Sequence, residues 1–192
     1  MARSTDIPGR LVVVTGPSGA GKSTILRRVL SRTEAHFSVS ATTREPREGE
    51  LSGRDYFFVS RSTFEDMIEA GEMLEWAEVH GALYGTPAAP VVEKVSEGAT
   101  VVLDVDVQGG LQVHQKHPEG TFVLIVPPKM DELRRRLEGR GTESQEKVER
   151  RLAKADEELK TARRSGVYNY EVVNDDLDRA IDELEDIVRG NK

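Results

Sequence analysis

A glycine-rich octapeptide early in the chain sets the tightest limit on its fold. The octapeptide consists of Gly16, Pro17, Ser18, Gly19, Ala20, Gly21, Lys22 and Ser23, which fit the pattern GxxxxGK[ST]. Residues 10–15 before it are apolar and largely β-branched, which is typical of a strand buried on both faces. Residues 23–32 after it carry apolar side chains at helical spacing. The sequence therefore predicts a strand, a tight glycine loop and a helix, in that order.

The rest of the chain continues the alternation of strands and helices, with one interruption. Further buried strands are expected at residues 100–105 and 122–126, and a short strand at 170–173. Helices are expected at residues 90–97, 130–138, 144–164 and 177–189. This alternation predicts an α/β fold with a parallel sheet covered by helices on both faces. Residues 38–87 break the rhythm and predict an inserted lobe with a small, mostly antiparallel sheet. Within the lobe we expect strands at 56–59 and 73–79, a capped helix at 62–70 and turns at 81–87. Residues 1–9 are polar, and we expect them to form a loose tail.

Composition excludes several functional classes. The chain has 27 Lys and Arg against 34 Asp and Glu, a net charge of −7, and so lacks the basic excess typical of nucleic-acid binding. It has no cysteine, which excludes a disulfide scaffold, a thiolate zinc site and a cysteine nucleophile. No apolar run approaches the roughly 20 residues of a membrane span, and the first residues lack an apolar signal stretch. We expect a cytoplasmic protein that binds neither nucleic acid nor membrane.

The octapeptide has the chemistry of a phosphate-binding loop. Its glycines let backbone N–H groups turn inward around a phosphate, and the following helix directs its positive end at the same anion. Lys22 can reach the β- and γ-phosphates of a nucleoside triphosphate, and the Ser23 hydroxyl can bind Mg²⁺. Asp104 and Asp106 end a predicted buried strand two residues apart, so we expect them on one face, with Asp104 holding Mg²⁺ through water. The alternative is that both carboxylates simply reach solvent.

Two groups of arginines are candidates for binding further anionic groups. Arg44 and Arg47 stand among hydroxyl residues with Tyr56 further along, which favours an oxyanion pocket, although a solvated polar loop has the same composition. Arg136 and Arg140 share a face of a predicted helix, and Arg151 lies on the next one. A mobile helical lid that supplies arginines and a pair of solvated charged helices are both consistent with this pattern.

Taken together, these segments resemble the guanylate kinase family over residues 10–189. The resemblance rests on GPSGAGKST at 16–24, SVSATTREPREGE at 38–50, DYFFVS at 55–60, EWAEVHGALYGTP at 75–87, VVLDVDVQG at 101–109, RRRLEGRGTES at 134–144 and VVNDDLD at 172–178. It implies an α/β phosphate-loop kinase that transfers the γ-phosphoryl group of ATP to GMP, and also to dGMP, with Mg²⁺, for purine salvage and GTP supply. It also implies a single domain with a core (10–37, 88–133 and 167–189), a mixed α/β GMP-binding lobe (38–87) and a helical lid (134–166).

The resemblance also assigns roles to individual positions of this chain. It implies that the GMP phosphate is held by Arg44, Arg47, Tyr56 and Tyr84, and the guanine base by Ser40, Glu75, Thr86 and Asp106. It implies ATP contacts from the octapeptide, Thr24 and Asn174, with Asn174 near the adenine. It implies Mg²⁺ contacts from Ser23 and Asp104. The catalytic residues implied are Lys22, Arg44, Arg136, Arg140 and Arg151. We further expect a monomer whose partners are only these nucleotides.

Two other functions fit parts of the pattern. One is a non-catalytic module that binds a phosphorylated protein in the GMP pocket; the intact Lys22 and Ser23 disfavour it. The other is a phosphate-loop kinase that acts on a different acceptor, such as a sugar phosphate. That acceptor is disfavoured by the residues whose hydrogen-bonding groups suit a guanine base: Ser40, Glu75, Thr86 and Asp106.

Overall fold

The computed structural model describes residues 9–139 and 144–192. The expected tail over residues 1–8 and the candidate Arg140 lie outside these ranges. No helix within the described ranges combines the length and the apolar character needed to cross a bilayer.

A five-stranded parallel sheet in the order β2-β7-β1-β8-β9 forms the core. The strands are β1 (Arg10–Thr15), β2 (His36–Phe37), β7 (Thr100–Asp104), β8 (Thr121–Val126) and β9 (Tyr170–Val173). Alternate residues of β1 serve the two faces: Val12 and Val14 lie in one apolar cluster, and Leu11 and Val13 in another. The expected α/β fold with a parallel central sheet is confirmed.

Helices cover both faces of this sheet. Helices α1 (Lys22–Arg32) and α7 (Leu177–Arg189) pack against each other and on the face of Val12 and Val14. On the face of Leu11 and Val13 lie α3 (Ala88–Ser96) and α4 (Val107–Lys116), through Val91 and Val113.

A second, four-stranded sheet in the order β4-β3-β6-β5 forms a small lobe with helix α2. Its elements are β3 (Ala41–Thr42), β4 (Phe57–Phe58), α2 (Arg61–Glu69), β5 (Met73–Val79) and β6 (Ala82–Pro87). The β3–β4 pair is parallel, whereas the β3–β6 and β5–β6 pairs are antiparallel. The side chain of Phe64 from α2 is fully buried in the lobe's apolar cluster.

The expectation of turns throughout residues 81–87 is wrong, since residues 82–87 form β6. The turn is confined to His80 and Gly81, whose φ angles of 53° and 81° suit a two-residue hairpin loop with positive φ at both positions. Gly85 lies within this strand, although glycine is typical of turns. A side chain at this position would have its Cβ 2.5 Å from the Glu75 carbonyl oxygen, so glycine there serves close packing within the sheet.

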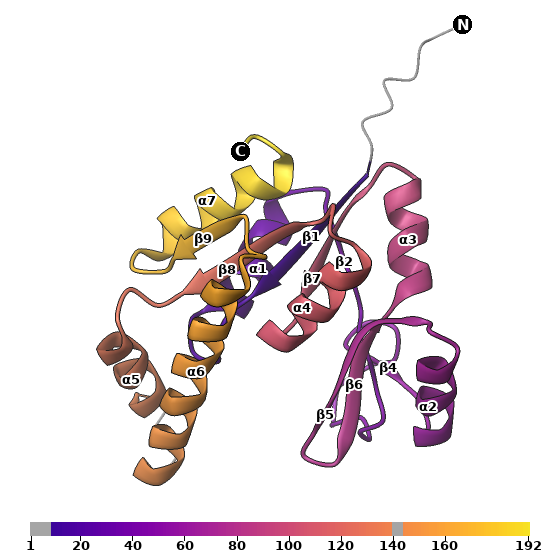
Figure 1. Ribbon diagram of the computed structural model, residues 1–192, viewed down its shortest axis with the longest axis horizontal. Coiled ribbons are helices and arrows are strands. Elements are labelled where there is room, and N and C mark those ends of the chain that lie inside the picture. The colour runs from indigo at the N-terminus through magenta and orange to yellow at the C-terminus, as the bar shows by residue number, and fades with distance from the viewer. Residues whose placement is uncertain (1–8, 140–143) are drawn as a thin grey trace, which may run out of the picture.

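A helical pair, α5 (Met130–Glu138) and α6 (Gln145–Ser165), completes the described chain. Leu133 and Leu137 of α5 pack against Val148 and Leu152 of α6. Figure 1 shows the lobe and the helical pair on the same side of the five-stranded sheet, to the lower right and lower left. A hollow of about 1140 Å³ lies between them.

Candidate active site

The octapeptide forms the predicted loop between β1 and α1. Gly16 leaves β1 so close to β8 that a Cβ there would lie 2.3 Å from the carbonyl oxygen of Ile125. Helix α1 then begins at Lys22 with Gly21 as its N-cap and no side-chain cap hydrogen bond. The first N–H groups of a helix lack intrahelical partners and attract anions. The loop therefore presents a site for a phosphate group.

A hollow of about 370 Å³ opens directly on this loop. Lys22 is one of the residues that line it, and its Nζ pairs with the carboxylate of Asp104 and lies 3.3 Å from the carbonyl oxygen of Val105. The hydroxyl of Ser23 follows in the first turn of α1. A hydroxyl and a carboxylate oxygen are ligands that suit Mg²⁺, so the donor set fits that ion.

The expectation that Asp104 and Asp106 share a strand face is wrong. Strand β7 ends at Asp104, and Asp106 is the N-cap of α4, where its Oδ1 accepts the N–H of Gly109 at 2.8 Å. The chain turns from strand to helix between the two residues, so strand alternation does not relate them. Both still belong to the site, because Asp104 pairs with Lys22 and Asp106 lines the hollow at the loop.

The lobe brings Arg44, Tyr56 and Tyr84 together. The Arg44 guanidinium lies 5.5 Å from the centroid of the Tyr56 ring, which in turn lies 5.9 Å from the Tyr84 ring. Glu50 accepts two hydrogen bonds from Arg44, at 2.9 and 3.0 Å, and a third from the backbone N–H of Arg47 at 2.7 Å. These donors lower the pKa of Glu50 to about 2, and the same pairing raises the pKa of Arg44. The pair thus holds the loop between Arg44 and Arg47 in shape.

Glu75 on β5 is a buried carboxylate with one side-chain hydrogen-bond donor. The Thr86 hydroxyl of β6 donates to its Oε1 at 2.7 Å, and the residue is only 7% exposed. Burial raises the pKa of Glu75, against the smaller opposing effect of Thr86. Next to it, the Gln112 side chain of α4 bonds both the N–H and the carbonyl of Trp76, at 3.1 and 3.0 Å. These two bonds fix strand β5 against α4. Ser40 is partly buried just before β3, where its carbonyl accepts the N–H of Phe57.

Two of the candidate arginines lie on the described helices α5 and α6 and take different positions. Arg151 on α6 donates to the hydroxyl of Ser18 in the phosphate loop at 2.5 Å. Arg136 on α5 donates to the backbone carbonyl of Asn174 at 2.9 Å and to Glu132 at 3.1 Å. Asn174 follows β9, and its side-chain amide donates to the carbonyl of Ala20 at 2.7 Å.

Sequence reasoning missed several residues of the site. Lys154 and Glu158 line the hollow at the phosphate loop, and Lys147 lines the larger hollow between the helical pair and the lobe. Together with Arg151 they stand at spacings of four, three and four residues, which places them on one face of α6. That spacing was available in the sequence. The pairing of Glu50 with Arg44 could not be predicted from the sequence, because no simple periodicity links the two residues.

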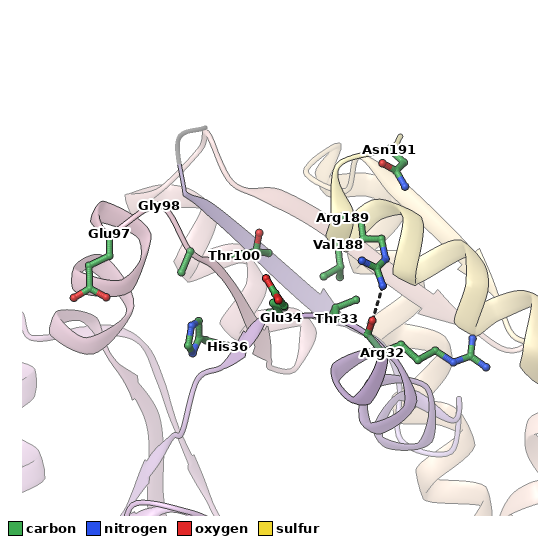
Figure 2. A pocket seen from close by; sticks show the side chains of 12 residues that line it. Arg32, Thr33, Glu34, His36, Glu97, Gly98, Thr100, Val188, Arg189 and Asn191 are labelled. Carbon is green, nitrogen blue, oxygen red and sulfur yellow. Dashed lines mark hydrogen bonds between the residues drawn. The ribbon is translucent and has the colours of Figure 1, made fainter. Parts of the chain in front are cut away.

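A separate hollow of about 910 Å³ lies at the opposite end of the strands from the phosphate loop, where α1 and α7 end and β7 begins. Figure 2 shows Arg189 reaching the carbonyl of Arg32 there. Arg32 also pairs with Asp182, and Arg189 with Glu185. None of the predicted site residues lines this hollow, so we place the candidate active site at the phosphate loop.

Comparisons with known proteins agree on one family. A family model described as guanylate kinase matches residues 8–191. The chain is 51% identical over 182 residues to a guanylate kinase of Rubrobacter xylanophilus, covering 94% of both chains. It is 47% identical over 185 residues to one of Caldanaerobacter subterraneus, covering 96% of this chain and 88% of that protein. A crystal structure of guanylate kinase from Anaplasma phagocytophilum superimposes with a TM-score of 0.71 at 32% identity, covering 95% of this chain and 86% of the other.

Proposed function

This chain belongs to the guanylate kinase family, and on that basis we propose which of its residues carry the ATP-dependent phosphorylation of GMP. One observation supports the proposal above the others. A phosphate loop with its lysine stands on one side of the site, and a buried carboxylate paired with a hydroxyl, Glu75 with Thr86, stands on the other. The first suits a triphosphate and the second a base that offers N–H donors.

The ATP side is proposed to use the octapeptide, Thr24 and Asn174. Lys22 exchanges Asp104 for the β- and γ-phosphates when ATP enters, since its Nζ already lies at the hollow. Ser23 and, through water, Asp104 are proposed to hold Mg²⁺, whose charge offsets that of the phosphate oxygens when it is bound.

The GMP side is proposed to divide phosphate recognition from base recognition. Arg44, Arg47, Tyr56 and Tyr84 hold the phosphate, because guanidinium and phenol groups are its natural donors. Ser40, Glu75, Thr86 and Asp106 read the guanine. A carboxylate at Glu75 accepts from the exocyclic amino group and the adjacent ring N–H of guanine. Adenine offers no such pair of donors at that edge and would leave the buried carboxylate unpaired.

Transfer itself needs positioning and charge neutralisation. A phosphate oxygen of GMP, already anionic, forms the new bond to the γ-phosphorus. The bond from that phosphorus to the β–γ bridging oxygen breaks, and ADP departs with the electron pair. No general base is required. Lys22, Arg136, Arg140 and Arg151 are proposed to neutralise the developing charge, and the Arg151–Ser18 contact supports this for the only one of these arginines that reaches the loop in the described structure.

We propose that residues 134–166 act as a lid that closes over a core of 10–37, 88–133 and 167–189 and a GMP lobe of 38–87, which would exclude water from the reaction. Use of dGMP is proposed because all the assigned contacts go to base and phosphate. A monomer in the cytoplasm that serves purine salvage and GTP supply completes the proposal.

A coupled ADP-release assay tests it. Purified protein with ATP and Mg²⁺ is given GMP, dGMP, AMP, CMP, UMP or a sugar phosphate in turn. We expect ADP release with GMP and dGMP only. Release with a sugar phosphate but not with GMP would overturn the acceptor assignment, and no release with any acceptor would favour the binding module.

A further inference from the structure

Asn174 joins three parts of the site that are distant in sequence. Its side-chain Nδ2 donates to the carbonyl of Ala20 in the phosphate loop at 2.7 Å, and its own N–H donates to the carbonyl of Val126 at the end of β8 at 2.8 Å. Its carbonyl accepts from Arg136 at 2.9 Å. The residue is 5% exposed, so these bonds form largely away from water. A buried polar group in such a position is costly unless it is fully bonded.

The bond to Ala20 matters for the geometry of the phosphate loop. A loop that turns its N–H groups inward toward a phosphate turns its carbonyls outward, and those carbonyls need donors of their own. The amide of Asn174 supplies one of these donors from behind the loop.

The neighbouring Gly21 makes this approach possible. A Cβ at Gly21 would lie 2.2 Å from the Nδ2 of Asn174, and the φ angle of Gly21 is +94°. The amide of Asn174 can therefore reach the loop only because residue 21 has no side chain.

We propose that Asn174 is a positioning residue for the triphosphate, which holds the phosphate loop in its binding shape through Ala20. Its backbone carbonyl also sets the resting position of Arg136. The proposal rests on the proposed function in taking the loop as the ATP site. In this proposal the Asn174 side chain supports binding of the phosphates rather than of the adenine ring. Its removal should therefore weaken the binding of any ligand that carries the phosphates.

The test compares a ligand with a base and a ligand without one. Calorimetry measures the affinity of ATP and of inorganic tripolyphosphate, each with Mg²⁺, for the wild type and for Asn174→Asp. Aspartate keeps the shape of the side chain but replaces the donor with a carboxylate that faces the Ala20 carbonyl. We expect both affinities to fall tenfold or more, and by a similar factor. A fall for ATP alone would overturn the proposal in favour of a base contact, and unchanged affinities would overturn it outright.

Asn169 provides the matched control at the other end of β9. There the side-chain Oδ1 accepts the N–H of Phe122 at 2.7 Å, so aspartate preserves the bond and alanine removes it. Asn169→Ala should lower the melting temperature without changing tripolyphosphate affinity, which separates loss of stability from loss of loop geometry. Asn174→Ala removes the donor without adding a charge, so the parallel fall in both affinities must appear in this variant as well. A fall confined to Asn174→Asp would reflect repulsion between the new carboxylate and the phosphates and would overturn the proposal.

These outcomes do not depend on the acceptor. Tripolyphosphate binding involves neither GMP nor turnover, so a wild type that fails to phosphorylate GMP would overturn the proposed function and leave this measurement intact. Parallel loss of both ligands in the Asn174 variants would still support the positioning role.

Discussion

Glu75→Gln changes one buried group, from a carboxylate oxygen to an amide nitrogen of nearly the same size. The Thr86 hydroxyl donates to Oε1, so the remaining oxygen of the glutamine is expected to stay with Thr86. The new NH₂ group then occupies the place of Oε2, which lies near Gly109 at the start of α4. There the NH₂ group would face the N–H donors of guanine, and two donors cannot form a hydrogen bond with each other.

The expected cost follows from the bond that is lost. A hydrogen bond to a charged group contributes about 1.5–3 kcal/mol, which corresponds to about 10- to 150-fold in the KM for GMP. The KM for ATP should stay within about twofold, because Glu75 lies in the lobe and the phosphate loop lies in the core. The preference for GMP over IMP, which lacks the 2-amino group, should shrink for the same reason.

Protein stability gives an independent readout of the same substitution. Burial raises the pKa of Glu75, so the folded state binds its proton more tightly than the unfolded state does. The ionised carboxylate therefore lowers the free energy of unfolding most at neutral pH. This destabilisation diminishes as the pH falls and is absent below the pKa that Glu75 has in the unfolded chain. Glutamine carries no such penalty, so the melting temperature at neutral pH should be equal to or higher than that of the wild type. The advantage should vanish in acid.

Steady-state ADP release over a range of GMP concentrations, at saturating ATP, measures the effect. Glu78→Gln is the matched control, because Glu78 stands on the same strand with an exposed side chain. An unchanged KM for GMP, or a rise confined to the KM for ATP, would refute the assignment of Glu75 to the base pocket. A lower melting temperature at neutral pH would refute the argument from burial.

Three further substitutions probe the rest of the site. Lys22→Ala should lower kcat by about three orders of magnitude with an unchanged circular dichroism spectrum, and a kcat near that of the wild type would remove the lysine from the mechanism. Glu50→Gln should raise the KM for GMP by up to about 100-fold because Arg44 loses its partner. The hydrogen bonds from Arg44 and Arg47 lower the pKa of Glu50 to about 2, so its carboxylate stays ionised between neutral pH and about pH 4, and the KM of the wild type should not respond to this group in that range. Gly109→Ala would place a Cβ 2.9 Å from the Oε2 of Glu75 and should raise the KM for GMP alone; an equal rise for ATP would point to a disturbed core.

The strand–loop–helix opening and helices α3, α5, α6 and α7 were readable from local pattern, whereas no range was predicted for helix α4. Apolar β-branched runs and helical spacing gave the expected parallel sheet, and the bounds of α5, β5, β9 and α7 agree with the structure. Helices α5 and α7 and strand β5 are long enough for their own side chains to set the period, so the neighbours add little information.

Short strands and the contacts between distant segments escaped sequence reasoning. Strands β2 and β3 have only two residues each, and β6 contains Gly85 and Pro87, so pairing rather than composition decides their conformation. Asp106 was expected on a strand and caps a helix, because the point at which the chain turns depends on the packing of α4.

The same distinction between local sequence pattern and contacts of distant segments applies to the candidate active site. The residue types that can bind phosphate, guanine and a divalent ion were evident from the order of the segments, because chemistry belongs to the side chains themselves. Which of them meet was not evident, since Arg44 with Glu50, Glu75 with Thr86 and Asn174 with Ala20 come together across gaps of 6, 11 and 154 residues. The bonds of Glu75 and Asn174 form only once the strands and helices that carry them have packed, and the Arg44–Glu50 pair forms only once the loop between the two residues is ordered. The free energy for this ordering comes from apolar burial elsewhere in the fold.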